Sequence, residues 1–156
     1  MQIPDKIIKI MLSLTKIFHF EMAHAICGYP GSCKNIHGHS YQLQVTVTGD
    51  KENQNYIPAP GFILDFKELK QLVTSSIIKT FDHKLILSGS YLDQNPAIKS
   101  QENLVALEAE PTAENLLLYI WAKVLGNVLP EEVKLVRLRL YETRDSYAEW
   151  TNDNMK

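Results

Sequence analysis

The chain has 156 residues, with 16 Lys and Arg, 18 Asp and Glu, and a formal net charge of -2. This length suits one domain over residues 1–156, with a hydrophobic core that needs no covalent supports. The charge balance gives no basic surface for nucleic acid or an anionic membrane, and no stretch reaches the roughly 20 apolar residues that span a bilayer. We therefore expect small molecules or further copies of the chain as partners.

The N-terminal apolar stretch, residues 7–14, is short, and lysines interrupt or flank it. No small-residue cleavage site follows, so it does not have the pattern of a secretory signal peptide. A domain with ordinary apolar content does not need Cys27 and Cys33 as a disulfide. These features predict a soluble protein with reduced thiols in the cytoplasm.

Two strands are predicted on either side of a loop that carries both cysteines. Alternation over residues 11–22 places Phe18, Phe20 and Met22 on one face of a strand that ends near His24. The glycines and proline of residues 25–36 indicate a loop. Residues 37–48 alternate again and predict a second strand. One face of that strand carries His37, His39, Tyr41, Leu43, Val45 and Val47.

Two helices follow. Asp65 is the predicted N-cap of the first because Glu68 follows three residues later; its expected buried residues are Phe66, Leu69, Val73, Ile77 and Phe81. The second is predicted from Thr112 to Gly126 and Pro130; its expected buried residues are Leu117, Ile120, Trp121, Val124 and Val128. The connection between them is too long to be structureless, and residues 104–109 are predicted as a short strand within it.

The last elements are a strand over residues 133–142 and, after a turn, a short edge strand over residues 147–151. One face of the longer strand is expected to carry Val136, Leu138, Leu140 and Glu142, and the other Leu135, Arg137, Arg139 and Tyr141. The order strand, strand, helix, helix, strand, strand predicts an α+β fold. We expect an antiparallel sheet with both helices on one face.

Three histidines indicate a metal site. The spacing of His37 and His39 on a strand aims both imidazoles the same way, and His24 ends the neighbouring strand. Three protein ligands leave a fourth position for water or substrate, as in catalytic zinc sites. Zinc is the expected ion, while iron, nickel and copper also accept imidazole.

The role of Cys33 stays open on spacing alone. As a fourth ligand it would close the metal site and make it structural; as a thiolate beside the metal it would serve as a base or nucleophile. Cys27 is interpreted as a small apolar loop residue.

Two further signals are weak by themselves. Asp82 next to His83 can orient that imidazole for proton transfer, but a histidine at a helix C-terminus is equally well explained by the helix dipole. Glu142 continues the apolar face of its strand. It can accept two parallel hydrogen bonds from a guanine-like or pterin ring, or it can mark the point where the strand reaches solvent.

Six segments in order along nearly the whole chain resemble the 6-pyruvoyl tetrahydropterin synthase family, and within it the bacterial 6-carboxy-5,6,7,8-tetrahydropterin synthases. They are residues 20–24 (FEMAH), 33–41 (CKNIHGHSY), 64–66 (LDF), 81–83 (FDH), 111–115 (PTAEN) and 141–143 (YET).

This resemblance implies the tunnelling fold (T-fold), in which subunits pool their strands into a barrel, as a trimer or hexamer. It implies Zn²⁺ on His24, His37 and His39, and Cys33 as the general base. Asp82 and His83 match the family's proton-relay pair, and Glu142 matches its pterin anchor. The substrate implied is 7,8-dihydroneopterin triphosphate.

Two departures from the family pattern bear on function. The stretch over residues 84–110 is longer than in compact bacterial members. Only three residues separate Cys33 from His37, which is similar to the carboxy branch and favours queuosine-pathway activity, with release of acetaldehyde and triphosphate. The alternatives are 6-pyruvoyl tetrahydropterin synthase activity on the same substrate and, more distantly, a non-catalytic oligomeric zinc protein.

Overall fold

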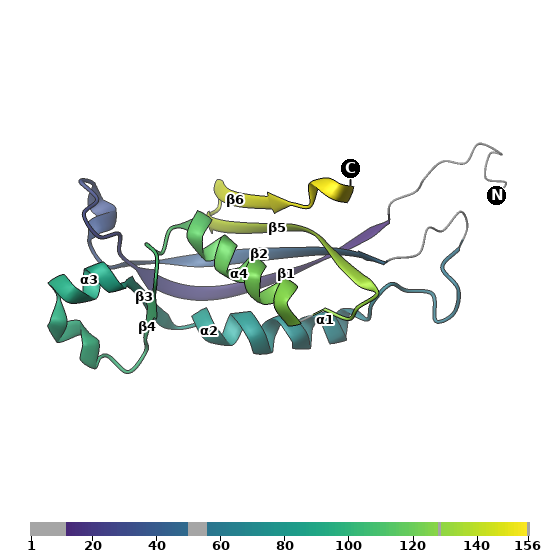
Figure 1. The fold of residues 1–156 in the computed structure, drawn as a ribbon, viewed down its shortest axis with the longest axis horizontal. Coiled ribbons are helices and arrows are strands. Elements are labelled where there is room, and N and C mark those ends of the chain that lie inside the picture. The colour runs from purple at the N-terminus through teal and green to yellow at the C-terminus, as the bar shows by residue number, and fades with distance from the viewer. Residues whose placement is uncertain (1–11, 50–55, 128, 156) are drawn as a thin grey trace.

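A six-stranded sheet covered by helices forms the α+β structure seen in the computed structural model, which describes residues 12–49, 56–127 and 129–155 (Figure 1). Along the sheet the strands lie in the order β4-β3-β1-β2-β5-β6. Their bounds are β1 Ser13–His24, β2 His37–Gly49, β3 Lys84–Ser88, β4 Leu104–Leu107, β5 Val133–Thr143 and β6 Ser146–Thr151. The predicted fold class is therefore confirmed.

The expected antiparallel pairing holds for β1, β2, β5 and β6. The two remaining strands are parallel additions, since β3 pairs in parallel with β1, and β4 with β3. The strand expected within residues 104–109 is confirmed as β4. Strand β3 was not predicted, because its central apolar run is buried on both sides and shows no alternation.

The long connection over residues 84–110 is thus structured throughout much of its length. Besides β3 and β4 it contains α3 (Gly89–Gln94) and the 3₁₀ helix η3 (Pro96–Ser100). A small separate core supports it, made of Ala25, Leu85, Leu87 and Leu92. This unit extends one end of the sheet beside the end of β1 (Figure 1).

The first predicted helix is observed as α1 (Phe66–Val73), a π-helical turn η2 (Thr74–Ile78) and α2 (Lys79–Phe81). Asp65 caps it by accepting a 2.8 Å hydrogen bond from the Lys67 amide. Four of the five expected buried residues are buried, namely Leu69, Val73, Ile77 and Phe81. Their four-residue spacing would drift by about 40° per step in a regular α-helix, and the wider π turn offsets that drift.

Phe66 is the exception, because its side chain is 52% exposed. It occupies the first position of α1, and its ring lies under the Lys16 ammonium group at 5.8 Å. The expectation that Phe66 is buried was therefore wrong.

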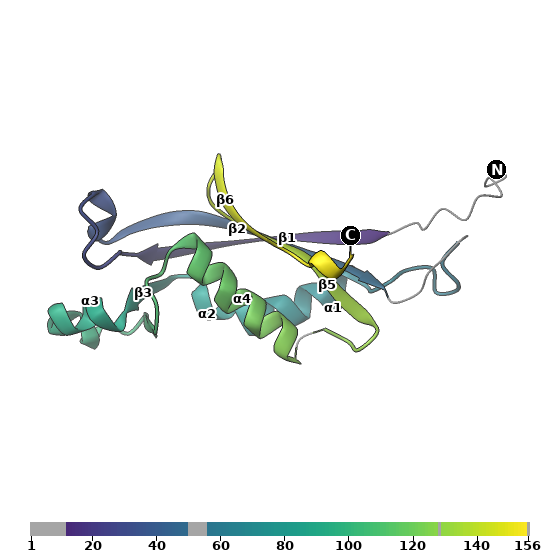
Figure 2. The same cartoon turned by 45° about the horizontal axis from the view of Figure 1, so that its top comes forward.

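The second predicted helix is α4 (Ala113–Asn127), and Thr112 caps it by accepting a hydrogen bond from the Asn115 amide. Its stripe packs as expected through Leu117, Ile120 and Val124, with Trp121 partly buried; Val128 lies outside the described residues. Helices α1, α2 and α4 lie on one side of the sheet (Figure 2). No helix in the described ranges is long and apolar enough to cross a membrane.

Strand β5 corrects one detail of the predicted alternation. Thr46 pairs with Arg137 and Val47 pairs with Leu135, so Val136 is an extra residue in a β-bulge. The bulge shifts the two-residue period, and Leu135 is buried in place of Val136. Beyond it Leu138 and Leu140 are buried, so Glu142 still follows the core-facing side to the strand's end.

Candidate active site

The three histidines meet where β1 ends and β2 begins. In the antiparallel pairing His24 lies opposite His37, and Met22 lies opposite His39. Because side chains alternate along each strand, His37 and His39 share the face toward which His24 also points. One possible ligand atom from each histidine lies within 4.8 Å of the other two.

Backbone carbonyls fix the orientation of two of these rings. His24 Nδ1 lies 2.6 Å from the Pro111 carbonyl oxygen, and His37 Nδ1 lies 2.8 Å from that of Asn35. A carbonyl only accepts, so each Nδ1 carries the proton and each Nε2 keeps its lone pair. That arrangement is typical of metal-binding histidines, whose second nitrogen donates to an outer partner.

The free nitrogens lie close enough to share one ion. His24 Nε2 and His37 Nε2 are 3.1 Å apart, and tetrahedral bonds of 2.0–2.1 Å would separate two zinc ligands by about 3.3 Å. Burial lowers the pKa of His24 against the opposing hydrogen bond to Pro111, so the ring favours the neutral form that binds metal. This cluster is able to hold a divalent transition metal.

Neither Cys33 nor Glu142 belongs to the group of mutually close ligand atoms found among the described residues. The protein therefore offers a metal three imidazoles from one chain. A fourth position remains for water or a substrate oxygen, the pattern of a catalytic rather than a structural centre.

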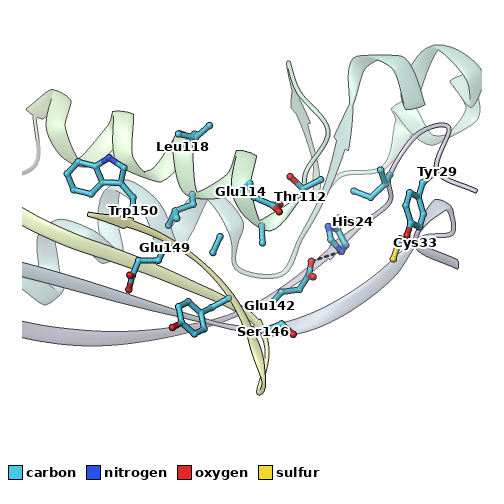
Figure 3. Close-up of a pocket in the computed structure, with 15 residues that line it drawn as sticks. His24, Tyr29, Cys33, Thr112, Glu114, Leu118, Glu142, Ser146, Glu149 and Trp150 are labelled. Carbon is cyan, nitrogen blue, oxygen red and sulfur yellow. Dashed lines mark ion pairs between the residues drawn. The ribbon is translucent and has the colours of Figure 1, made fainter. Parts of the chain in front are cut away.

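Cys33, His24 and Glu142 line one cavity of about 600 Å³ (Figure 3). Cys33 lies in the short 3₁₀ helix η1 (Ser32–Lys34), within the predicted loop, and both cysteines are free thiols. The N-terminal half of α4 and strand β6 form the opposite wall, with Thr112, Leu118 and Trp150 among the residues that Figure 3 labels.

Glu142 enters this cavity from the end of β5 and lies beside the histidines. Its Oε1 is 3.5 Å from His24 Nε2 and 4.0 Å from His39 Nε2. The buried Tyr41 hydroxyl donates to the same oxygen at 3.2 Å. Burial, followed by the nearby Glu142 charge, raises the pKa of Tyr41, so this hydroxyl stays protonated as a donor.

Asp82 and His83 form a pair, but they do not line the cavity. Asp82 Oδ1 lies 3.0 Å from His83 Nδ1 and accepts a hydrogen bond from the Glu21 amide. That backbone hydrogen bond is the main cause that lowers the pKa of Asp82, which keeps the carboxylate ionised. His83 has a left-handed backbone, with φ of 59°, and its side chain is 80% exposed.

The structure adds groups that sequence reasoning missed. Tyr41 was placed on the histidine face without a role, although its position two residues beyond His39 was a usable signal. The backbone carbonyls of Pro111 and Asn35 could not be recognised from the sequence, because every residue has a backbone carbonyl. The walls from α4 and β6 depend on tertiary packing.

Comparisons with known proteins agree with this geometry. Residues 13–153 match the profile of the family described as 6-pyruvoyl tetrahydropterin synthase. The chain is 29% identical to a 6-carboxy-5,6,7,8-tetrahydropterin synthase of Haemophilus influenzae, over 90% of this chain and 99% of that protein. It is 33% identical to a 6-pyruvoyl tetrahydrobiopterin synthase of Pongo abelii, over 72% of this chain and 66% of that protein.

Solved structures give the fold. An uncharacterized protein from Wolinella succinogenes superposes with a TM-score of 0.72 at 18% identity, over 92% of this chain and 99% of that one. The 6-pyruvoyl tetrahydropterin synthase of Caenorhabditis elegans superposes with a TM-score of 0.64 at 20% identity, over 92% and 96%. The single-chain fold of the tunnelling-fold proteins is thereby confirmed. The chain belongs to the 6-pyruvoyl tetrahydropterin synthase family.

Replacing one ligand should abolish tight metal binding. We expect His39→Ala to bind a divalent metal at least about 100-fold more weakly than the wild type, because removing a ligand costs more than removing its outer partner. Chelator competition followed by elemental analysis measures this. The matched control is His19→Ala, an exposed histidine on the other face of β1. Equal losses in both variants would contradict the site.

Proposed function

We propose that this protein converts 7,8-dihydroneopterin triphosphate to 6-carboxy-5,6,7,8-tetrahydropterin, with release of acetaldehyde and triphosphate, as a zinc-dependent carbon-oxygen lyase. The observation that carries the proposal is one cavity lined by a metal-binding histidine, a free thiol and a carboxylate, in a chain of this family. This proposal includes a role in 7-deazapurine (queuosine) synthesis and a cytoplasmic location, which the two free thiols support.

The proposed ion is Zn²⁺ on His24, His37 and His39, which present neutral nitrogens at suitable separations. Zinc bound there would supply Lewis-acid polarisation of the hydroxyl oxygens of the substrate side chain. The carbonyls of Pro111 and Asn35 hold two rings in the metal-binding tautomer, so little rearrangement is needed on binding.

Two side chains of the cavity would carry out proton removal and substrate positioning. Cys33 would remove a proton from the substrate side chain as the general base. Glu142, held by the Tyr41 hydroxyl, would accept parallel hydrogen bonds from the pterin ring and fix the side chain in register with Cys33. The absence of Cys33 from the close ligand group supports this base over the rival role of a fourth structural ligand.

The proton relay requires a second subunit in this proposal. Asp82 is half-buried and paired with exposed His83, and neither residue is part of the cavity of its own chain. Among the described residues that line the cavity there is also no Lys or Arg to bind a triphosphate. In a trimer or hexamer, a neighbouring subunit could bring its own Asp82 and His83 to the mouth of the cavity. The same neighbour could supply the basic side chains that bind the triphosphate.

A product assay tests the reaction. Zinc-loaded protein incubated with 7,8-dihydroneopterin triphosphate should give equal amounts of 6-carboxytetrahydropterin, acetaldehyde and triphosphate, measured by mass spectrometry. 6-Pyruvoyl tetrahydropterin without acetaldehyde would favour the alternative activity, which the similarity to the Pongo abelii protein supports. No turnover at full zinc loading would support the non-catalytic alternative.

A Cys33 variant distinguishes the role of general base from the role of fourth zinc ligand. We expect Cys33→Ala to keep its zinc and lose activity by about 100-fold or more, the size of a general-base contribution. Zinc content and kcat are measured together. Cys27→Ala is the control, because that half-buried thiol does not line the cavity and should retain activity. Loss of zinc from Cys33→Ala would instead indicate a structural ligand.

Mixed oligomers test the shared site. Cys33→Ala and His83→Ala should each be inactive alone. Co-expressed with distinct affinity tags, they should recover activity, with about a quarter of the sites intact when subunits mix at random around a closed ring. Activity per mixed oligomer is the measurement. No recovery in verified mixed oligomers would place both residues in the same subunit's site.

A further inference from the structure

A carboxylate at the end of the 84–110 connection reaches back across the chain. Glu110 Oε2 accepts a 2.7 Å hydrogen bond from the backbone amide of Cys27, 83 residues earlier. Glu110 is itself held, because its carbonyl oxygen accepts from the Asn115 side chain at 2.9 Å and from the Thr112 amide at 2.8 Å. The carboxylate is thus anchored at the start of α4.

The donor of this hydrogen bond, the Cys27 amide, belongs to the loop that carries the Cys33 thiol. The Ile26 amide donates to the Cys33 carbonyl at 2.8 Å, which joins the start and the end of that loop. Cys27 is the next residue, so a bond to its amide restrains the closed end of the loop and with it Cys33. Between these two ends, Gly28 adopts a φ of 70° and the chain passes through exposed Tyr29 and Pro30.

The next residue, Pro111, holds the ring of His24. Pro111 accepts from His24, so two consecutive residues hold a proposed zinc ligand and the thiol loop. Glu110 does not line the cavity and would not touch substrate. Any contribution of Glu110 to the site would therefore act through the position of the loop that carries Cys33.

We propose that Glu110 is a positioning residue that holds the Cys27–Cys33 loop so that the Cys33 thiol stays in reach of the metal-bound substrate. The assignment rests on the proposed function, in which Cys33 is the base. It depends on the reach of the side chain and its oxygen acceptor, not on its charge.

Two conservative variants separate reach from charge. Glu110→Gln keeps the reach and an acceptor oxygen but removes the charge. Glu110→Asp keeps the charge but withdraws the carboxylate by about 1.5 Å, one carbon-carbon bond, which takes it beyond hydrogen-bond distance from the Cys27 amide. Glu108→Asp and Glu108→Gln are matched controls at an exposed residue of the same segment.

We expect Glu110→Asp to keep full zinc and to lose about 10- to 100-fold in kcat, since small misplacements of a reacting group have effects of that size. KM should change less than about twofold, and the acid limb of the kcat/KM pH profile should not move. Glu110→Gln should remain within about threefold of the wild type. The reverse ranking, or loss of zinc in Glu110→Asp, would overturn the proposal.

A second readout is independent of turnover. In a Cys27→Ala background, which keeps the backbone amide that Glu110 binds, the rate of Cys33 alkylation by iodoacetamide reports the placement of the thiol. We expect Glu110→Asp to change this rate at least about fivefold and Glu110→Gln less than twofold. If the wild type proves inactive on dihydroneopterin triphosphate, the proposed function fails while this result still decides the role of Glu110. Equal rates in all variants would overturn it.

Discussion

The antiparallel register of β1 and β2 is the constraint on which the site depends. It pairs His24 with His37 and Met22 with His39. A shift of one residue would turn the histidines of one strand to the opposite face of the sheet. The register is fixed by the core that begins beside the site, where Phe20 stacks on Tyr41 with ring centroids 5.2 Å apart and Leu43 and Val45 are fully buried. Burial of the core therefore specifies the geometry of the metal cluster.

Alternation of buried and exposed side chains along a strand explains which parts of the fold could be predicted from the sequence. The half-buried strands β1 and β2 show clear alternation, so their faces and the shared orientation of His37 and His39 followed from sequence. Strand β3 has no alternation, and its parallel pairing with β1 depends on packing between distant segments. The bulge at Val136 is set by pairing with β2, which the sequence of β5 alone does not contain.

Some residues of the candidate site could likewise be predicted from the sequence, and others could not. Residue types and spacing identified His24, Cys33 and Glu142, and the structure places all three around one cavity. Asp82 and His83 were predicted as a pair and lie together, yet outside that cavity. Their adjacency in the sequence predicts the pairing, but their position relative to the cavity depends on the packing of distant segments. The contacts of Glu110 with Cys27 span 83 residues and have no local signature.

The outer hydrogen bonds of the histidines have a consequence for mutation. Both characterised acceptors, at Pro111 and Asn35, are main-chain oxygens. Substituting either side chain leaves the acceptor in place, provided that the backbone follows the same path. Either side chain can therefore be replaced without removing the oxygen that sets the tautomer of the imidazole. What the two rings require at these positions is the course of the backbone rather than a particular side chain.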